Sequence, residues 1–263
     1  MKDEKKFSFE NDLLRLPGQS ATDELNEIID SKVDGHLFMI AASVMLILFT
    51  WVVHFEKVEP NPYVVTLTAL ILILVSSLKL RKYKRDIINL KQGIKGERYV
   101  GQILEGLRAD GYQVFHDIVA ESFNLDHVII GPAGIFVIET KTWGNKAEIG
   151  SAKYDGKTLY LNNHPVPRNP IMQSLGSARW LSDTLRKSTG TQFRVKPLIA
   201  LPSKFIKSEV NKVLEKEGVY MLNPKNIKAF LGAKKDSEIL SAEQISQVSF
   251  HLSRIIASTV SKN

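Results

Sequence analysis

The residues best suited to chemistry lie in one stretch, FNLDHVIIGPAGIFVIETK, at residues 123–141. Asp126 begins one apolar run and Glu139 ends the next, and a Gly-Pro-Ala-Gly turn at 131–134 separates them. In a hairpin folded about that turn, the two carboxylates lie near each other at one end. Carboxylates held close together repel each other, so this pair favours a divalent cation such as Mg²⁺.

Lys141 adds a positive charge beside the two acids. Glu139 and Lys141 are two residues apart, so on a strand their side chains face the same side. A lysine beside a metal-bound water orients it, assists its deprotonation or stabilises developing negative charge. Metal, activated water and a nearby cation are what phosphodiester hydrolysis requires. The alternative is a solvated turn carboxylate at Asp126 and a surface ion pair that contributes little.

The surrounding pattern predicts an α/β domain that begins near Lys91. A helix over 93–110 precedes strands over 112–119, 125–130 and 134–140, and the last two strands form the hairpin. The remaining expected elements are a hairpin over 153–161 that turns at Asp155-Gly156, a long helix over 169–187 with Pro170 in its first position, strands over 194–201 and 218–222, and helices over 224–231 and 242–259.

Two apolar stretches, 36–55 and 62–80, precede this domain and have no charge in their central portions. About 20 helical residues at about 1.5 Å each cross a hydrocarbon core of about 30 Å. Trp51 and Tyr63 lie near the connecting loop, where interfacial aromatic residues are common. The alternative is a buried helical hairpin of a soluble protein, but both stretches are apolar all round rather than along one stripe.

Basic residues follow the second stretch. The segment KLRKYKR at 79–85 carries five of them, whereas the loop between the stretches offers only Lys57. The positive-inside rule therefore predicts a multi-pass protein of a bacterial-type inner membrane, with both termini cytoplasmic. We expect the cluster at 79–85 to contact anionic lipid headgroups, and a nucleic-acid patch is the alternative.

These patterns divide the chain into five parts. Asp23, Leu25 and Ile28 predict a short amphipathic helix in the first part, with a loosely ordered tail as the alternative. The expected parts are a cytoplasmic tail (1–35), a transmembrane helical hairpin (36–80), a basic juxtamembrane linker (81–92), the α/β domain (93–232) and a C-terminal helix (233–263).

Composition limits the classes of chemistry. The sequence has no cysteine, which excludes disulfides, thiolate metal sites and cysteine nucleophiles. The formal net charge of +7 favours nucleic acid or anionic lipid as a partner. The chain has no H-E-x-x-H or G-x-S-x-G motif, and Gly156-Lys157-Thr158 lacks the first glycine of a phosphate loop, where Ser151 stands.

Four segments resemble the nuclease-related domain (NERD) family of the PD-(D/E)xK nuclease superfamily. The resemblance covers about residues 90–200 and leaves the apolar hairpin and the last third of the soluble part unexplained. It implies a restriction-endonuclease-like mixed sheet flanked by helices. The four segments are Lys95-Gly96-Glu97, Asp126-His127 with Gly131-Pro132 and Gly134, Ile138-Glu139-Thr140-Lys141, and Asn169-Pro170 with Gln173.

The resemblance also implies a role for each site residue. Asp126 and Glu139 would bind Mg²⁺ or Mn²⁺ together with the backbone carbonyl of Thr140, and Lys141 would act on the water. Glu97 would bind metal directly or through water; its alternative is a first-turn glutamate favoured by the helix dipole. A further residue, Gln173, would position substrate or the lysine, or would be a plain helix-surface amide.

Residues around the motif have open assignments. His127 is expected to pack or hydrogen-bond on the opposite face rather than bind metal, and Trp143 either stacks on a base or covers the sheet edge. The loop residues Lys146, Lys153, Lys157 and Arg168 are candidates to track a phosphate backbone.

The sequence thus predicts a membrane-anchored, divalent-metal-dependent nuclease that acts on nucleic acid, with DNA expected before RNA. The alternative is a catalytically inactive module of the same fold that binds nucleic acid or a protein partner at the membrane.

Overall fold

The N-terminal apolar segments form helices in the computed structural model, which describes residues 15–55, 61–120, 123–143, 148–202, 204–233 and 239–260. The first are α1 (Gln19–Glu27), a π-helical turn (Ile28–Val33) and α2 (Asp34–Phe55). Then α3 (Pro62–Glu105) ends in a 3₁₀ turn (Gly106–Asp110). The helical runs Gln19–Phe55 and Pro62–Asp110 are each long and apolar enough to cross a membrane.

The described chain forms two compact units. Among the described residues, Ser20–Gln92 form one unit, and those from Gly93 onward together with Arg15–Gln19 form the other. The helix α3 contributes to both, because it contains the boundary at Gln92.

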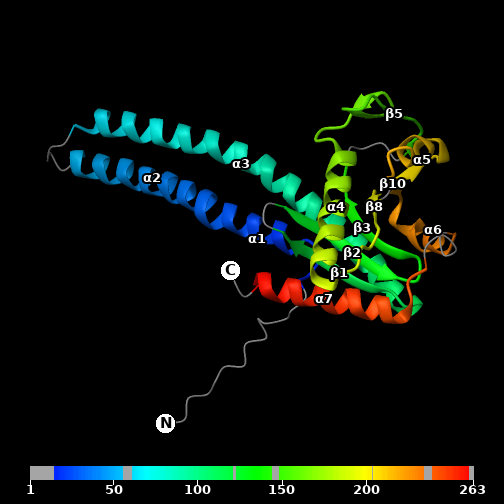
Figure 1. Ribbon diagram of the computed structural model, residues 1–263. Helices are drawn as coiled ribbons and strands as arrows, with labels where there is room; N and C mark the ends of the chain where they lie inside the picture. Colours follow the sequence, from blue (N-terminus) through cyan, green and yellow to red (C-terminus); the bar gives the residue numbers. More distant parts are fainter. Residues whose placement is uncertain are drawn as a thin grey trace, which may run out of the picture. The chain divides into compact units, whose positions relative to one another are not determined.

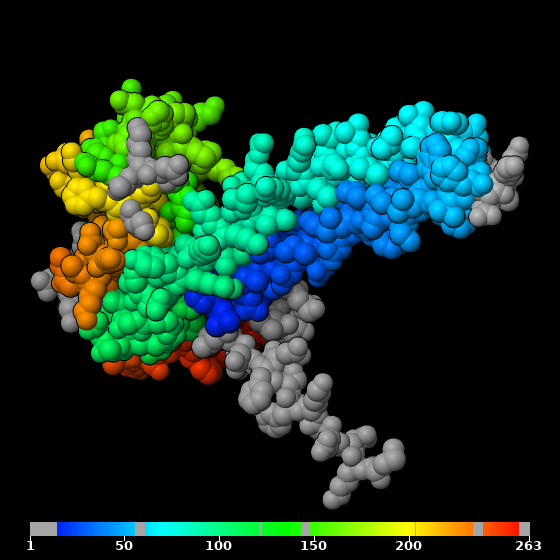
Figure 2. Space-filling model, turned by 180° about the vertical axis from the view of Figure 1, so that it is seen from behind, coloured from blue at the N-terminus to red at the C-terminus, as the bar shows by residue number. Residues whose placement is uncertain are grey.

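In the first unit, α2 and the apolar part of α3 lie side by side (Figure 2). Trp51 donates a hydrogen bond from Nε1 to Thr66 Oγ1 at 3.1 Å, and the rings of His36 and Tyr83 stack with centroids 5.9 Å apart. The buried positions of the two helices are small or weakly polar, whereas large apolar side chains such as Phe38 and Phe49 are exposed. The buried small residues are Ser43, Thr50, Ala69 and Ser76.

Residues 81–92, the expected juxtamembrane linker, are helical and continue α3. No glycine or proline lies between Pro62 and Gly93, and lysine, arginine, leucine and isoleucine all tolerate a helix, so nothing in the segment ends α3. In the expected tail, Gln19–Val33 is helical, which agrees with the amphipathic-helix interpretation; residues 1–14 lie outside the described part.

The second unit is built on a five-stranded mixed sheet, which confirms the expected fold class. Its strand order is β1-β2-β3-β8-β10; β1, β2 and β3 pair antiparallel, whereas β3 with β8 and β8 with β10 pair parallel. The strands are β1 (Gln113–Val119), β2 (Asn124–Gly131), β3 (Gly134–Thr140), β8 (Val195–Ala200) and β10 (Tyr220–Leu222). The strand β3 is buried along its whole length, as its unbroken apolar run predicts.

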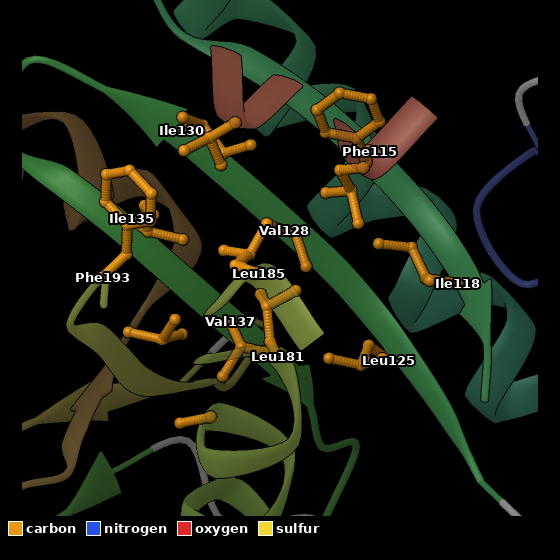
Figure 3. Close-up of a cluster of buried hydrophobic side chains, with 14 of the residues drawn as sticks. Phe115, Ile118, Leu125, Val128, Ile130, Ile135, Val137, Leu181, Leu185 and Phe193 are labelled. Atoms are coloured by element: carbon orange, nitrogen blue, oxygen red, sulfur yellow. The ribbon is translucent and has the colours of Figure 1, made fainter. Parts of the chain in front are cut away.

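Helices cover both faces of this sheet (Figure 1). On one face, α4 (Pro170–Thr189) and α7 (Ala242–Val260) pack on a cluster in which Val128, Val137 and Leu181 meet (Figure 3). On the other, the end of α3 and α6 (Ile227–Ala233), which follows a 3₁₀ turn (Pro224–Asn226), cover a cluster around Phe136.

Smaller elements extend the C-terminal end of β3 and β8. They form a two-stranded parallel sheet and a three-stranded antiparallel sheet, and the hairpin of β5 and β6 was expected. The helix α5 and strands β4, β7 and β9 were not. These elements are β4 (Glu148–Ile149), β5 (Ala152–Tyr154), β6 (Leu159–Leu161), β7 (His164–Pro165), β9 (Phe205–Ile206) and α5 (Ser208–Glu215).

Candidate active site

The β2–β3 hairpin brings the two central carboxylates together. The register pairs Gly131 with Gly134 across a two-residue turn and His127 with Ile138, so Asp126 and Glu139 follow as neighbours beyond the last pair. The backbone N–H of Thr140 donates to Asp126 Oδ2 at 2.7 Å, which fixes this carboxylate against the end of β3.

Two side chains, Lys141 just after β3 and Gln173 on α4, close around Glu139, which is 5 % exposed. Lys141 donates from Nζ to Glu139 Oε1 at 2.7 Å and to Gln173 Oε1 at 3.0 Å. Gln173 in turn donates from Nε2 to Glu139 Oε1 at 2.6 Å. The three groups form a closed hydrogen-bonded triangle, so Gln173 holds both the carboxylate and the lysine.

The start of α4 sets the position of Gln173. Asn169 caps the helix by accepting hydrogen bonds from the N–H groups of Ile171 and Met172, and Pro170 occupies the first helical position. Gln173 therefore lies in the first turn, directed at the end of β3. The Asn169-Pro170 motif positions a site residue by ordinary helix capping.

Two acids of the site, Glu97 and Asp126, have raised pKa values. Burial raises the pKa of Glu97 on α3 from 4.5 to about 7, with further contributions from the Asp117 and Glu139 carboxylates and an opposing one from Lys141. Burial also raises the pKa of Asp126 well above 3.8, and the charges of Glu139 and Glu97 add to it. Glu97 and Asp126 thus lie in an environment in which burial and neighbouring carboxylates disfavour their ionised forms.

A buried hydrogen-bonded chain supports Thr140 from the opposite face. His116 Nε2 lies 2.9 Å from Glu105 Oε1, His116 Nδ1 lies 2.8 Å from His127 Nδ1, and His127 Nε2 lies 3.3 Å from Thr140 Oγ1. Burial lowers the pKa of both histidines, so both rings are neutral near pH 7. One assignment of the hydrogens then gives every one of these atoms a partner. Thr140 Oγ1 donates to His127 Nε2, His127 Nδ1 donates to His116 Nδ1, and His116 Nε2 donates to Glu105 Oε1. His127 is therefore a hydrogen-bonding residue, as expected.

Two polar residues inside β1, His116 and Asp117, were not singled out from the sequence. Their side chains are 8 % and 3 % exposed in a strand that is otherwise apolar through its centre. Two polar residues inside a buried apolar run are the signal that points to them, because such groups need partners. Arg15 donates from Nε to Asp117 Oδ2 at 2.5 Å.

The donor set suits a divalent cation with few protein ligands. Among the described residues, no three His, Asp or Glu side chains gather into a metal-binding group. Mg²⁺ commonly takes one or two carboxylates and completes its shell with water and substrate phosphate, so Asp126 and Glu139 meet that requirement. A cation bound between the two carboxylates would offset the Coulomb contribution by which Glu139 raises the pKa of Asp126. The contribution of the Thr140 carbonyl stays a prediction.

The other candidates divide into exposed, packed and undescribed residues. Lys153, Lys157 and Arg168 are exposed around the three-stranded sheet, whereas Lys146 lies outside the described residues. Trp143 packs against the apolar cluster around Leu159, which favours covering the sheet edge over stacking on a base.

A separate pocket of about 990 Å³ lies along α4 and β8. Met172, Arg179, Arg194 and Lys196 are among the residues that line it, and none of the proposed catalytic residues does. The candidate site lies instead where β2 begins and β3 ends.

The comparison with protein families agrees with this geometry. Residues 92–202 match the nuclease-related domain (NERD) family. No curated protein and no solved structure matches the chain. The matched range contains the first-helix glutamate, the β2–β3 hairpin, Lys141 and the start of α4, so the part of the chain that is similar to this family includes the whole residue set of the candidate site.

Proposed function

We propose that this chain is a divalent-metal-dependent nuclease that hydrolyses phosphodiester bonds of nucleic acid, with DNA as the first substrate to test. The observation that carries the proposal is that Asp126 on β2 and Glu139 on β3 are neighbours at one end of these strands, with Lys141 hydrogen-bonded to Glu139. The match to the nuclease-related domain family supports it, as does the net charge of +7.

The proposed ligands of Mg²⁺ or Mn²⁺ are Asp126, Glu139 and the Thr140 carbonyl, with Glu97 bound directly or through water. The two hydrogen bonds that Glu139 accepts both use Oε1, so we assign its Oε2 to the cation. Asp126 Oδ2 accepts a hydrogen bond from the Thr140 N–H, so we assign Asp126 Oδ1 to the cation. When bound, such a cation lowers the pKa of a water ligand and draws charge from the phosphoryl oxygens.

Lys141 and Gln173 then have distinct tasks. Lys141 stabilises negative charge on the phosphoryl group or orients the attacking water, because its ammonium group already lies beside Glu139. Gln173 holds that ammonium group in place through Oε1. The amide thus positions the lysine.

We also propose that the two apolar helices anchor the protein in a membrane, a bacterial-type inner membrane in the sequence-based prediction. Small and weakly polar residues are buried between them while large apolar side chains face outward. That polarity suits lipid, since a hairpin in water would bury its large apolar residues. The exposed basic residues at 79–85 suit anionic headgroups, and this supports a topology with both termini on the cytoplasmic side.

The test uses the full chain in detergent with plasmid, linear and single-stranded DNA and with RNA, each with Mg²⁺, Mn²⁺ or a chelator. Cleavage is expected only with metal, and Glu139→Ala is expected to reduce it by about 100-fold or more, because a ligand of the cation is lost. Glu217→Ala, at an exposed acid of the same domain, is the matched control.

Cleavage by Glu139→Ala at the rate of the wild type contradicts the assignment. Salt-sensitive binding of nucleic acid without any product instead favours the inactive binding module.

A further inference from the structure

The segment Arg15–Gln19 lies against the domain at the Glu97 side of the site, although it precedes the apolar helices in the chain. It belongs to the same compact unit as Gly93–Asn263. A side chain at Gly101 on α3 would overlap the ring of Pro17. A Cβ on Gly18 would lie 3.3 Å from Glu97 Oε2. The segment therefore touches both α3 and the carboxylate that α3 contributes.

Arg15 fixes this segment to the sheet through an ion pair with Asp117. The Nε–Oδ2 distance is 2.5 Å, and the two side chains are 17 % and 4 % exposed. A carboxylate taken out of water is costly unless a cation and hydrogen bonds compensate it. The guanidinium group of Arg15 is such a cation.

Asp117 occupies an unusual position in β1. It lies between the pairs His116–His127 and Ile118–Leu125, which places it across from Asp126 on the neighbouring strand. Its φ is +47°, in the left-handed region that a residue other than glycine seldom adopts within a strand. Such strain persists only where the surrounding structure enforces it, and it occurs often at functional sites.

Gly18 connects the same segment to Glu97, because a Cβ on this residue would lie 3.3 Å from Glu97 Oε2. The segment thus contacts β1 through Arg15 and the first-helix glutamate through Gly18. Gly18 borders the same glutamate, and its φ of +70° explains the glycine there.

We propose that Arg15 and Asp117 are positioning residues of the candidate site, and that Arg15–Gln19 is a structural part of it. This inference rests on the proposed function. Arg15 holds Asp117 in its strained conformation across from Asp126, and the same ion pair fixes the segment whose Gly18 then confines the Glu97 carboxylate. The segment lies outside residues 92–202, so a fragment that begins near Gly93 lacks a component of the site.

The test compares Arg15→Ala, Arg15→Lys and the wild type as full chains in detergent, with Arg186→Ala at an exposed position of α4 as the matched control. Three quantities are measured: kcat and KM for metal-dependent cleavage, the thermal midpoint, and amide hydrogen exchange. Arg15→Ala is expected to lower kcat by about 10- to 100-fold with little change in KM, because a displaced Glu97 weakens the reacting geometry and not substrate binding.

Exchange is expected to rise only in Gln113–Val119 and in the turns of α3 around Glu97, with the thermal midpoint maintained. Arg15→Lys should recover most of kcat, since it keeps a cation beside Asp117. Arg186→Ala should match the wild type in every measurement. Where Arg15→Ala does not fold, the double variant Arg15→Ala/Asp117→Asn removes both charges and tests the same loss of kcat.

Wild-type kcat and wild-type exchange in Arg15→Ala overturn the inference. A general rise in exchange across the sheet with a lowered midpoint, unrecovered by lysine, also overturns it, because Arg15 then only stabilises the fold. If the wild type cleaves nothing, the proposed function fails, but hydrogen exchange still tests the roles of Arg15 and Asp117. A rise in exchange confined to Gln113–Val119 and the turns of α3 around Glu97 supports those roles, and no rise contradicts them.

Discussion

At the scale of single residues, the site is a set of acids that repel one another and are compensated by few cations. Burial and neighbouring carboxylates raise the pKa of Glu97 and of Asp126, and Lys141 opposes that effect at both residues. Groups arranged in this way occur often at functional sites, because a fold selected for stability alone would avoid them. The arrangement also makes stability depend on pH.

Glu97 should make the chelated protein less stable as pH rises. Its pKa is about 7 in the folded state, against 4.5 for a free carboxyl, so its stabilising contribution is full below about pH 4.5 and is lost as pH rises through 7. The loss is at most about 3 kcal/mol. Thermal unfolding with chelator should show the wild-type midpoint falling relative to Glu97→Gln between about pH 5 and pH 8. Parallel profiles would contradict the raised pKa.

The sequence predicts some of these residues and misses others for a physical reason. Asp126 and Glu139 meet because a tight turn fixes the pairing of two adjacent strands, which is local information. Arg15 and Asp117 are 102 residues apart, and their contact depends on how the N-terminal segment packs on the domain. No spacing rule encodes such a contact.

At the scale of elements, close packing fixes the open end of the hairpin. Gly131 pairs with Gly134 at the turn, and a side chain at Gly131 would overlap the ring of Tyr112, which is 5 % exposed. The ring cannot move away without opening the cluster around Phe136. The hairpin therefore depends on this glycine for the register that brings the two acids together.

Gly131→Ala should lower the free energy of unfolding by about 1–3 kcal/mol, the usual cost of overpacking a core. Gly176→Ala in the interior of α4 is the control, since nothing lies within 4 Å of the added methyl group and the helix should gain about 0.5–1 kcal/mol. Urea unfolding of both variants in the same detergent gives the comparison. Equal stability of the two variants would show that the Tyr112 ring yields freely.

The helix α3 continues through a segment that is rich in charge. The run from Lys79 to Gln92 is rich in charge, which favoured a linker, yet it contains no glycine or proline to end the helix. Side-chain charge sets where a helix faces solvent, whereas backbone breakers set where it ends. The strands of the domain were predicted closely, since their apolar runs are short and bounded by turns.

At the scale of the whole molecule, the chain joins a region that matches the nuclease-related domain family to a pair of apolar helices with small residues between them. Both ends of such a pair lie on the same side of a membrane when each helix crosses it once. The domain and the N-terminal segment then share one compartment, which the contact between Arg15 and Asp117 requires.

The absence of cysteine permits a direct test of this topology by single-cysteine labelling. A cysteine replacing Asn61 in the loop between the helices should react with a membrane-impermeant maleimide in intact cells. A cysteine replacing Lys187, at the exposed end of α4, should react only after permeabilisation. The reverse pattern would invert the topology, and release of the protein by a salt wash would exclude the anchor.

The dependence of the cleavage rate on Mn²⁺ concentration, measured for the wild type and for Asp126→Asn, tests whether the two carboxylates form a metal-dependent active site. For the wild type, we expect the rate to rise with Mn²⁺ and to saturate. For the variant, we expect either no cleavage or a half-maximal Mn²⁺ concentration at least about tenfold higher, because a carboxylate ligand is replaced by a neutral amide. Superimposable curves from the two proteins would contradict the claim that Asp126 and Glu139 form a metal-dependent active site.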